Sequence, residues 1–184
     1  MSAPTHAIID IDVILDRSNT RDVLRALLHA ILFHRLFGNI KPQTFEVLDV
    51  TIPGVADPDM EKLVNEKVEV FWKGMESGAH NKRGQVSVTY STKQPKKSWL
   101  GITYEEEVPW EQWNINVEVK HPKSEQDRQT YLRTLPNTLT RALQTMLIHT
   151  SSEAGRAAVP PITNSNISPF PMKITVKVGG TEVG

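Results

Sequence analysis

The chain contains no cysteine among its 184 residues. This absence excludes disulfide bonds, thiolate zinc sites and cysteine nucleophiles together. No apolar stretch approaches the roughly 20 residues that a membrane-spanning helix needs. The N-terminal residues also lack the basic and apolar blocks of a secretory signal. We therefore expect a soluble, cytoplasmic protein without a transmembrane segment.

The chain has no excess of charge of either sign. Lys plus Arg and Asp plus Glu both number 21, so the formal net charge is zero. No long-range field would steer such a chain toward nucleic acid, and we expect no nucleic-acid partner. The length is enough for one domain with a hydrophobic core and too short for two. We interpret residues 1–184 as a single domain.

Sequence motifs of catalysis and cofactor binding are missing as well. There is no glycine-rich phosphate loop, GxSxG elbow or HExxH motif. His29 and His34 lie five residues apart on a predicted helix, which separates them by about 140°, so they cannot share a metal. We therefore expect no enzyme, cofactor or metal. A small α+β enzyme is the alternative, favoured by a pocket in which His34 or His149 meets a carboxylate of perturbed pKa.

Periodic patterns of apolar residues divide the chain into strands and helices. They predict strands at residues 6–15, 44–52, 85–91, 110–120 and 172–178, and helices at residues 21–37, 58–78 and 125–149. Ser18-Asn19-Thr20, Asp57 and Ser124 are predicted N-caps. Pro136 predicts either a bend in the third helix or a later start. The order βαβαββαβ indicates an α+β fold with three helices packed mainly on one face of a mixed sheet.

The first predicted helix is apolar on most sides, which is typical of a central buried helix. One stripe along it begins charged and ends apolar. The stripe contains Asp22, Arg25, His29, Phe33 and Leu36. It is a candidate protein contact surface, and the alternative is that another segment of the chain covers it. His34 and Arg35 lie away from the stripe, near the helix C-terminus where the backbone dipole favours cations.

Three of the four tryptophans lie close together, at positions 99, 110 and 113. Residues 92–109 are predicted to form a loop, which becomes the long tip of a hairpin if the flanking strands pair. Trp99 has no obvious core to enter. Large aromatic side chains on a polar, glycine-bearing loop are typical of a binding surface. The alternative is a loop that folds back so that Trp99 plugs the edge of the core.

Four segments in register resemble the autophagy-related protein 101 family. They are LLHAILFHR at residues 27–35, VPWEQW at 108–113, SEQDRQ at 124–129 and PFPMKI at 169–174. The resemblance implies a HORMA fold and a binding function without catalysis. It implies a subunit of the autophagy-initiating kinase complex, located at the pre-autophagosomal structure, that pairs with the HORMA domain of autophagy-related protein 13 and stabilises it.

The resemblance also directs attention to two sets of residues. We expect the pairing surface on the first helix, at His29, Phe33, His34, Arg35 and Leu36. Animal members carry an exposed Trp-Pro-Phe finger that recruits downstream autophagy factors, and Trp99 lies where its tryptophan would be. The finger phenylalanine is absent from this sequence. The candidates to replace it are Leu100, Ile102 and Tyr104.

Another HORMA adaptor, of the spindle-checkpoint or translesion-synthesis kind, is the alternative within binding modules. Such adaptors use a mobile C-terminal belt to enclose a partner peptide. Only one strand is predicted after the third helix, which leaves few residues for a belt. We therefore expect a HORMA domain of the open type that docks through a fixed surface.

Overall fold

The computed structural model describes residues 5–78 and 83–184. The segment on which the absence of a secretory signal was judged lies largely outside these residues. The elements are β1 (Ala7–Asp16), α1 (Thr20–Arg35), β2 (Pro42–Val47), β3 (Val50–Val55), α2 (Pro58–Ser77), β4 (Arg83–Lys97), β5 (Thr103–Lys120), α3 (Glu125–Ser151), α4 (Glu153–Ala157), β6 (Met172–Val178) and β7 (Thr181–Glu182). Within the described ranges, no helix is long and apolar enough to span a membrane.

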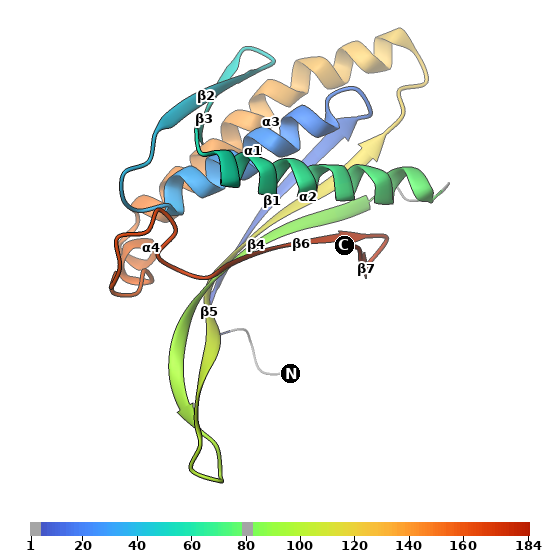
Figure 1. The fold of residues 1–184 in the computed structure, drawn as a ribbon. Coiled ribbons are helices and arrows are strands. Elements are labelled where there is room, and N and C mark those ends of the chain that lie inside the picture. The colour runs from blue at the N-terminus through green and yellow to red at the C-terminus, as the bar shows by residue number, and fades with distance from the viewer. Residues whose placement is uncertain (1–4, 79–82) are drawn as a thin grey trace.

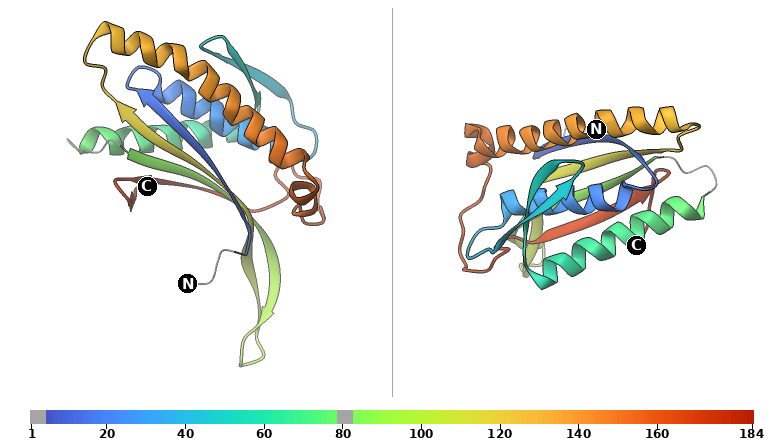
Figure 2. Two further views of the ribbon diagram at one scale, coloured as in Figure 1. Left: turned by 180° about the vertical axis from the view of Figure 1, so that it is seen from behind. Right: turned by 90° about the horizontal axis from the view of Figure 1, so that it is seen from above.

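Five of the strands form one mixed sheet in the order β1-β5-β4-β6-β7. β1 runs parallel to β5, whereas the other neighbours are antiparallel. The helices α1, α2 and α3 all lie on one face of this sheet, with α1 between the other two (Figures 1 and 2). The predicted α+β fold and the placement of its three helices are confirmed.

The second sheet is the β2–β3 hairpin, which lies over α1 on the side away from the five-stranded sheet (Figure 2). The helix α1 is therefore covered by strands on two opposite sides. Its residues Leu24, Leu27, Leu28 and Ile31 are completely buried. This sandwiched position explains why the sequence of α1 is apolar almost all round.

Local signals place the helix boundaries. The side chain of Asp57 accepts a hydrogen bond from the Met60 backbone N–H at 3.0 Å, and Ser124 accepts one from Asp127 at 3.1 Å. Both are ordinary N-caps. Asn19 is the N-cap residue of α1, but its side chain caps no helical N–H. α3 continues through Pro136, so a later start of this helix is wrong.

The prediction of one strand at residues 44–52 is wrong, because the chain turns within it. Leu48 and Asp49 adopt φ angles of 48° and 62° and join β2 to β3. Two consecutive residues in the left-handed region make a tight two-residue hairpin turn, for which Asn-Gly is the typical sequence. Leu48-Asp49 is not a sequence typical of this turn. α4 and β7, with five and two residues, are too short to show a period.

The predicted loop at residues 92–109 is also wrong, although the pairing of its flanking strands is confirmed. β4 and β5 remain paired as far as Lys97 and Thr103. We call residues 91–109 the arm. It projects from the body as a two-stranded ribbon (Figure 1). Ion pairs across it join Lys93 to Glu105 at 3.9 Å and Lys96 to Glu106. Such cross-strand pairs stabilise an antiparallel ribbon.

Candidate protein-binding surfaces

The tip of the arm is an ordered turn. The Ser98 N–H donates to the Ile102 carbonyl at 2.8 Å, and the Gly101 N–H donates to the Ser98 carbonyl at 2.9 Å. The Ser98 hydroxyl accepts from the Ile102 N–H at 3.2 Å. Gly101 has a φ of +76°, a conformation that other residues adopt only with strain. These bonds hold the tip in one shape without help from the body.

Apolar side chains at this tip face solvent. Trp99 is 92% exposed, Leu100 64%, Ile102 63% and Tyr104 48%. The alternative in which Trp99 plugs the core is therefore wrong. The neighbouring tryptophans, Trp110 and Trp113, are 8% and 0% exposed and belong to the core. A protruding cluster of this kind can insert into a recess on another molecule.

Charged residues follow the tip along both strands of the arm. Lys93, Lys96 and Lys97 lie on β4, and residues 105–107 on β5 are all glutamate. A hydrogen bond and the charge of Glu106 raise the pKa of Lys96. Glu105 and Glu106 thus pair with lysines across the ribbon, whereas the apolar side chains of the tip are exposed to solvent.

The stripe on α1 is buried at His29 and Leu36, which therefore cannot serve as a contact surface, whereas Phe33 is half-buried and Asp22 is exposed. His29 is completely buried beneath the β2–β3 hairpin. Its ring centroid lies 4.7 Å from that of Phe45, and its Nδ1 lies 3.5 Å from the Val55 backbone nitrogen. Burial lowers the pKa of His29. The β2–β3 hairpin, which was not predicted from the sequence, is the segment that covers His29.

The other expected pairing residues divide into two groups. Arg35 and Leu36 are buried at 3% and 5% exposure, so their expected exposure is wrong. Phe33 and His34 are half-buried, and their ring centroids lie 5.7 Å apart. Burial and, secondly, the charge of Arg35 lower the pKa of His34. Only Phe33 and His34 of this set can touch a partner in the observed conformation.

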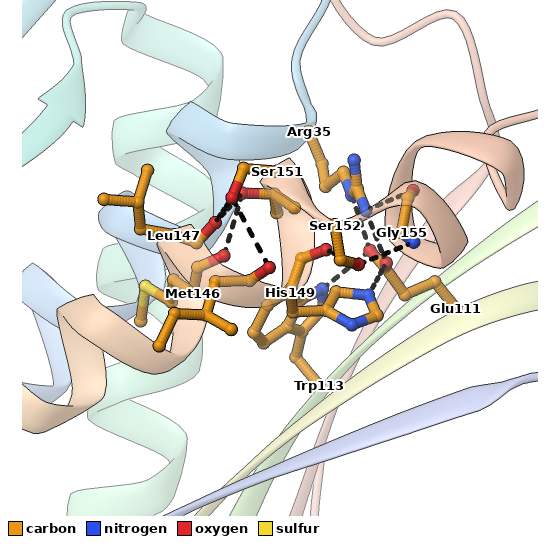
Figure 3. Close-up of polar contacts among 11 residues, drawn as sticks. Arg35, Glu111, Trp113, Met146, Leu147, His149, Ser151, Ser152 and Gly155 are labelled. Atoms are coloured by element: carbon orange, nitrogen blue, oxygen red, sulfur yellow. Dashed lines mark hydrogen bonds and ion pairs between the residues drawn. The ribbon is translucent and has the colours of Figure 1, made fainter.

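Arg35 instead belongs to a buried ion-pair cluster, which we define as Arg35, Glu111, Trp113 and His149 (Figure 3). The Arg35 Nε and Nη2 each donate to a different oxygen of Glu111 at 2.7 Å. The Trp113 Nε1 donates to Glu111 at 2.8 Å, and the His149 Nε2 lies 2.7 Å from it. Arg35 also donates to the Gly155 carbonyl at 3.1 Å. The cluster therefore ties α1, β5, α3 and α4 together.

Burial alone would raise the pKa of Glu111, which has no exposed surface. The hydrogen bonds and charge of Arg35, with the bonds from Trp113 and His149, outweigh burial and lower this pKa. The carboxylate is thus held in its charged form by groups from three elements of the fold, α1, β5 and α3.

The meeting of His149 with Glu111 is the condition that would favour an enzyme. However, a carboxylate with a lowered pKa is a weak base, and Glu111 is closed to solvent. The nearby Ser152 hydroxyl donates to the His149 carbonyl at 2.7 Å and accepts from the Gly155 N–H at 2.9 Å. This geometry provides an ion pair and a helix cap, and no activated nucleophile.

An exposed apolar pair on α3 was not predicted from the sequence. Leu147 is 59% exposed and Ile148 is 68% exposed. One turn further on, Thr150 and Ser151 line a cavity of about 420 Å³ together with His34. The C-terminal ends of α1 and α3 thus share a surface. The exposure of two adjacent large residues near the end of a helix that packs on the sheet could not be inferred from the helix period.

Comparison with known proteins shows the family to which this chain is similar. A sequence model described as autophagy-related protein 101 matches residues 12–166. A protein of that name from Arabidopsis thaliana is 37% identical over 105 residues, which cover 55% of this chain and 47% of the relative. One from Schizosaccharomyces pombe is 33% identical over 100 residues, covering 53% and 52%. The human protein of that name is 25% identical over 134 residues, covering 65% and 60%. The chain spans about half the length of the first two relatives.

Proposed function

The chain belongs to the autophagy-related protein 101 family, and we propose that it serves autophagy as a non-catalytic binding subunit. In this proposal its fold is a HORMA domain of the open type. It works in the cytoplasm and at the pre-autophagosomal structure within the autophagy-initiating kinase complex. There it binds and stabilises the HORMA domain of autophagy-related protein 13, and the tip of its arm recruits downstream factors.

The exposure of Trp99 is the observation that carries this proposal. A tryptophan that is 92% exposed at the end of an ordered turn keeps a large apolar area in water. Within the fold this ring buries little surface, whereas in a partner's recess it would be desolvated. Leu100, Ile102 and Tyr104 extend the same surface and are the candidates to replace the missing phenylalanine.

A second surface is available for the pairing partner. We propose that it comprises Phe33 and His34 of α1 with Leu147 and Ile148 of α3. The two helix ends lie next to each other, because His34 of α1 lines the same cavity as Thr150 and Ser151 of α3. Leu147 and Ile148 are 59% and 68% exposed, and their side chains supply the apolar centre that a stable interface needs. This surface lies on the body, so it can be occupied while the arm tip binds another molecule.

The test is a titration with the purified HORMA domain of autophagy-related protein 13. Ile148→Asp should weaken this binding at least about tenfold, because it puts a charge at the centre of an apolar interface. Ile162→Asp is the matched control, since Ile162 is 49% exposed and lies outside both surfaces. Equal binding by both variants would reject the pairing surface. Absence of binding by the wild-type chain would reject the partner and favour another HORMA adaptor.

Recruitment is measured separately with Trp99→Ala. This variant should bind the HORMA domain of autophagy-related protein 13 as the wild type does and should lose downstream autophagy factors. Trp99→Phe should keep part of the recruitment, because an aromatic ring remains. Loss of both activities in Trp99→Ala would show that the arm tip and the pairing surface act as one binding surface.

A further inference from the structure

We propose that the buried ion-pair cluster aims the arm, so that Arg35 and Glu111 are positioning residues for Trp99. The two lie in the body and act through the strand β5, which continues into the arm. The importance of this direction for recruitment rests on the proposed function. The direction itself is a property of the isolated chain.

The cluster lies where the sheet narrows from four strands to two. Glu111 pairs with Ala7, the first residue of β1. On its other side Glu111 pairs with Tyr90, which in turn pairs with Met172, the first residue of β6. Beyond this row, the described residues form no further strand pairing on the outer edge of β4 or β5, and one backbone bond from Ser91 to Pro171 remains. Glu111 is therefore the last residue of β5 that the sheet holds from both sides.

A β-bulge follows directly. Tyr90 pairs with Glu111, but the next residue, Ser91, pairs with Pro109. Trp110 is thus an extra residue without a partner across the strand pair. A bulge bends its strand and increases the local twist, so this position sets the angle at which the arm departs.

Aromatic rings and a guanidinium group surround the extra residue. The Trp110 ring centroid lies 5.7 Å from that of Tyr90 and 5.2 Å from that of Phe170. The Arg35 Cζ lies 5.6 Å from the centroid of the Trp110 ring. One guanidinium group therefore contacts the ring of the bulge residue and also binds both oxygens of Glu111. It fixes two consecutive residues of β5 at the bend.

Most of the arm beyond its base lies in solvent. Residues 93–97 and 99–105 are all exposed. At the base, the Ser91 N–H donates to the Pro171 carbonyl at 2.9 Å. Ser91 and Trp99 are separated by about 26 Å at roughly 3.3 Å per strand residue. A rotation of about 10° at the bulge would move the tip by about 4 to 5 Å, the width of a side chain.

The absence of cysteine allows a direct measurement of this direction. Spin labels on Leu100→Cys and Lys73→Cys report the distance from the tip to α2 by double electron–electron resonance. Labels on Lys73→Cys and Arg141→Cys report a distance within the body. Glu111→Gln should broaden or shift the tip distribution by several ångströms and leave the body distribution unchanged. A purely structural role would change neither distribution in a folded chain, or both.

Arg35→Met combined with Glu111→Gln covers the case in which Glu111→Gln alone does not fold. The double variant has no unpaired buried charge, so it keeps the fold, but it lacks the forked bond to Glu111. It should broaden the tip distribution as well. Unchanged tip distances in every folded variant would overturn the proposal. The measurement needs no partner, so a failure of recruitment and a failure of aiming are seen separately.

Discussion

The arm tip and the first-helix stripe both place large apolar residues beside polar ones, yet the fold treats them in opposite ways. Trp99 is 92% exposed, whereas His29 is completely buried. The helix α1 lies between the sheet and the β2–β3 hairpin, and Phe45 of that hairpin contacts His29 of the stripe. The tip lies where only two strands continue. Coverage by segments distant in the sequence, rather than local composition, decides which apolar residues are free to bind.

The largest expected effect is at the buried end of α1. Glu111→Leu should lower the free energy of unfolding by about 3 to 5 kcal/mol, because Arg35 would remain buried and charged without its anion. Chemical denaturation measures this loss. Arg35→Met combined with Glu111→Leu should recover most of it, since no charge is then left unpaired. A single variant as stable as the wild type would contradict the structural role of Arg35.

The next effect tests the covering hairpin. A Cβ on Gly54 would lie 2.4 Å from the Phe45 Cε2 and 3.1 Å from the His29 Cβ. Gly54→Ala should therefore cost about 1 to 3 kcal/mol through overpacking. Phe45→Leu in the same chain should relieve part of the clash by shortening the opposing side chain. If Gly54→Ala unfolds at the wild-type temperature, the close packing of the hairpin on α1 at Gly54 is contradicted.

A smaller effect concerns pH. Burial lowers the folded-state pKa of His29 below its ordinary value of 6.5, so the unfolded chain takes up a proton more readily. The stability from a neutral His29 is complete above that value and is lost as the pH falls below it toward the folded pKa. Melting temperatures between about pH 7.5 and about pH 5.5 should fall further for the wild type than for His29→Gln. Parallel curves for the two proteins would contradict a buried neutral His29.

Much of the fold could be predicted from the sequence, because period and caps are local properties. The alternation at Ile9, Ile11 and Val13 marked β1, and Asp57 marked the start of α2. The turn at Leu48 could not be predicted, because its left-handed backbone follows from the pairing of β2 with β3. The arm was missed for the same reason, since its strands are stabilised by each other.

The candidate sites were predictable to different degrees. A glycine-bearing polar segment with no apolar period indicated an exposed Trp99, but the sequence left open the alternative in which this ring plugs the core. The Arg35–Glu111 pair could not be predicted, because 76 residues separate its members and each one alone resembles an ordinary surface charge. The exposure of Leu147 and Ile148 was not predicted, because Leu147 continues the apolar period of α3 and Ile148 lies beside it.

The most direct test of the contrast between the arm tip and the first helix is Trp99→Ala, assayed for thermal unfolding and for recruitment of downstream autophagy factors. The stability should stay within about 0.5 kcal/mol of the wild type while recruitment is lost, because Trp99 is 92% exposed in its own fold. A loss of about 3 to 5 kcal/mol would identify a core tryptophan. Unchanged stability with undiminished recruitment would show that the exposed tip is not a binding element.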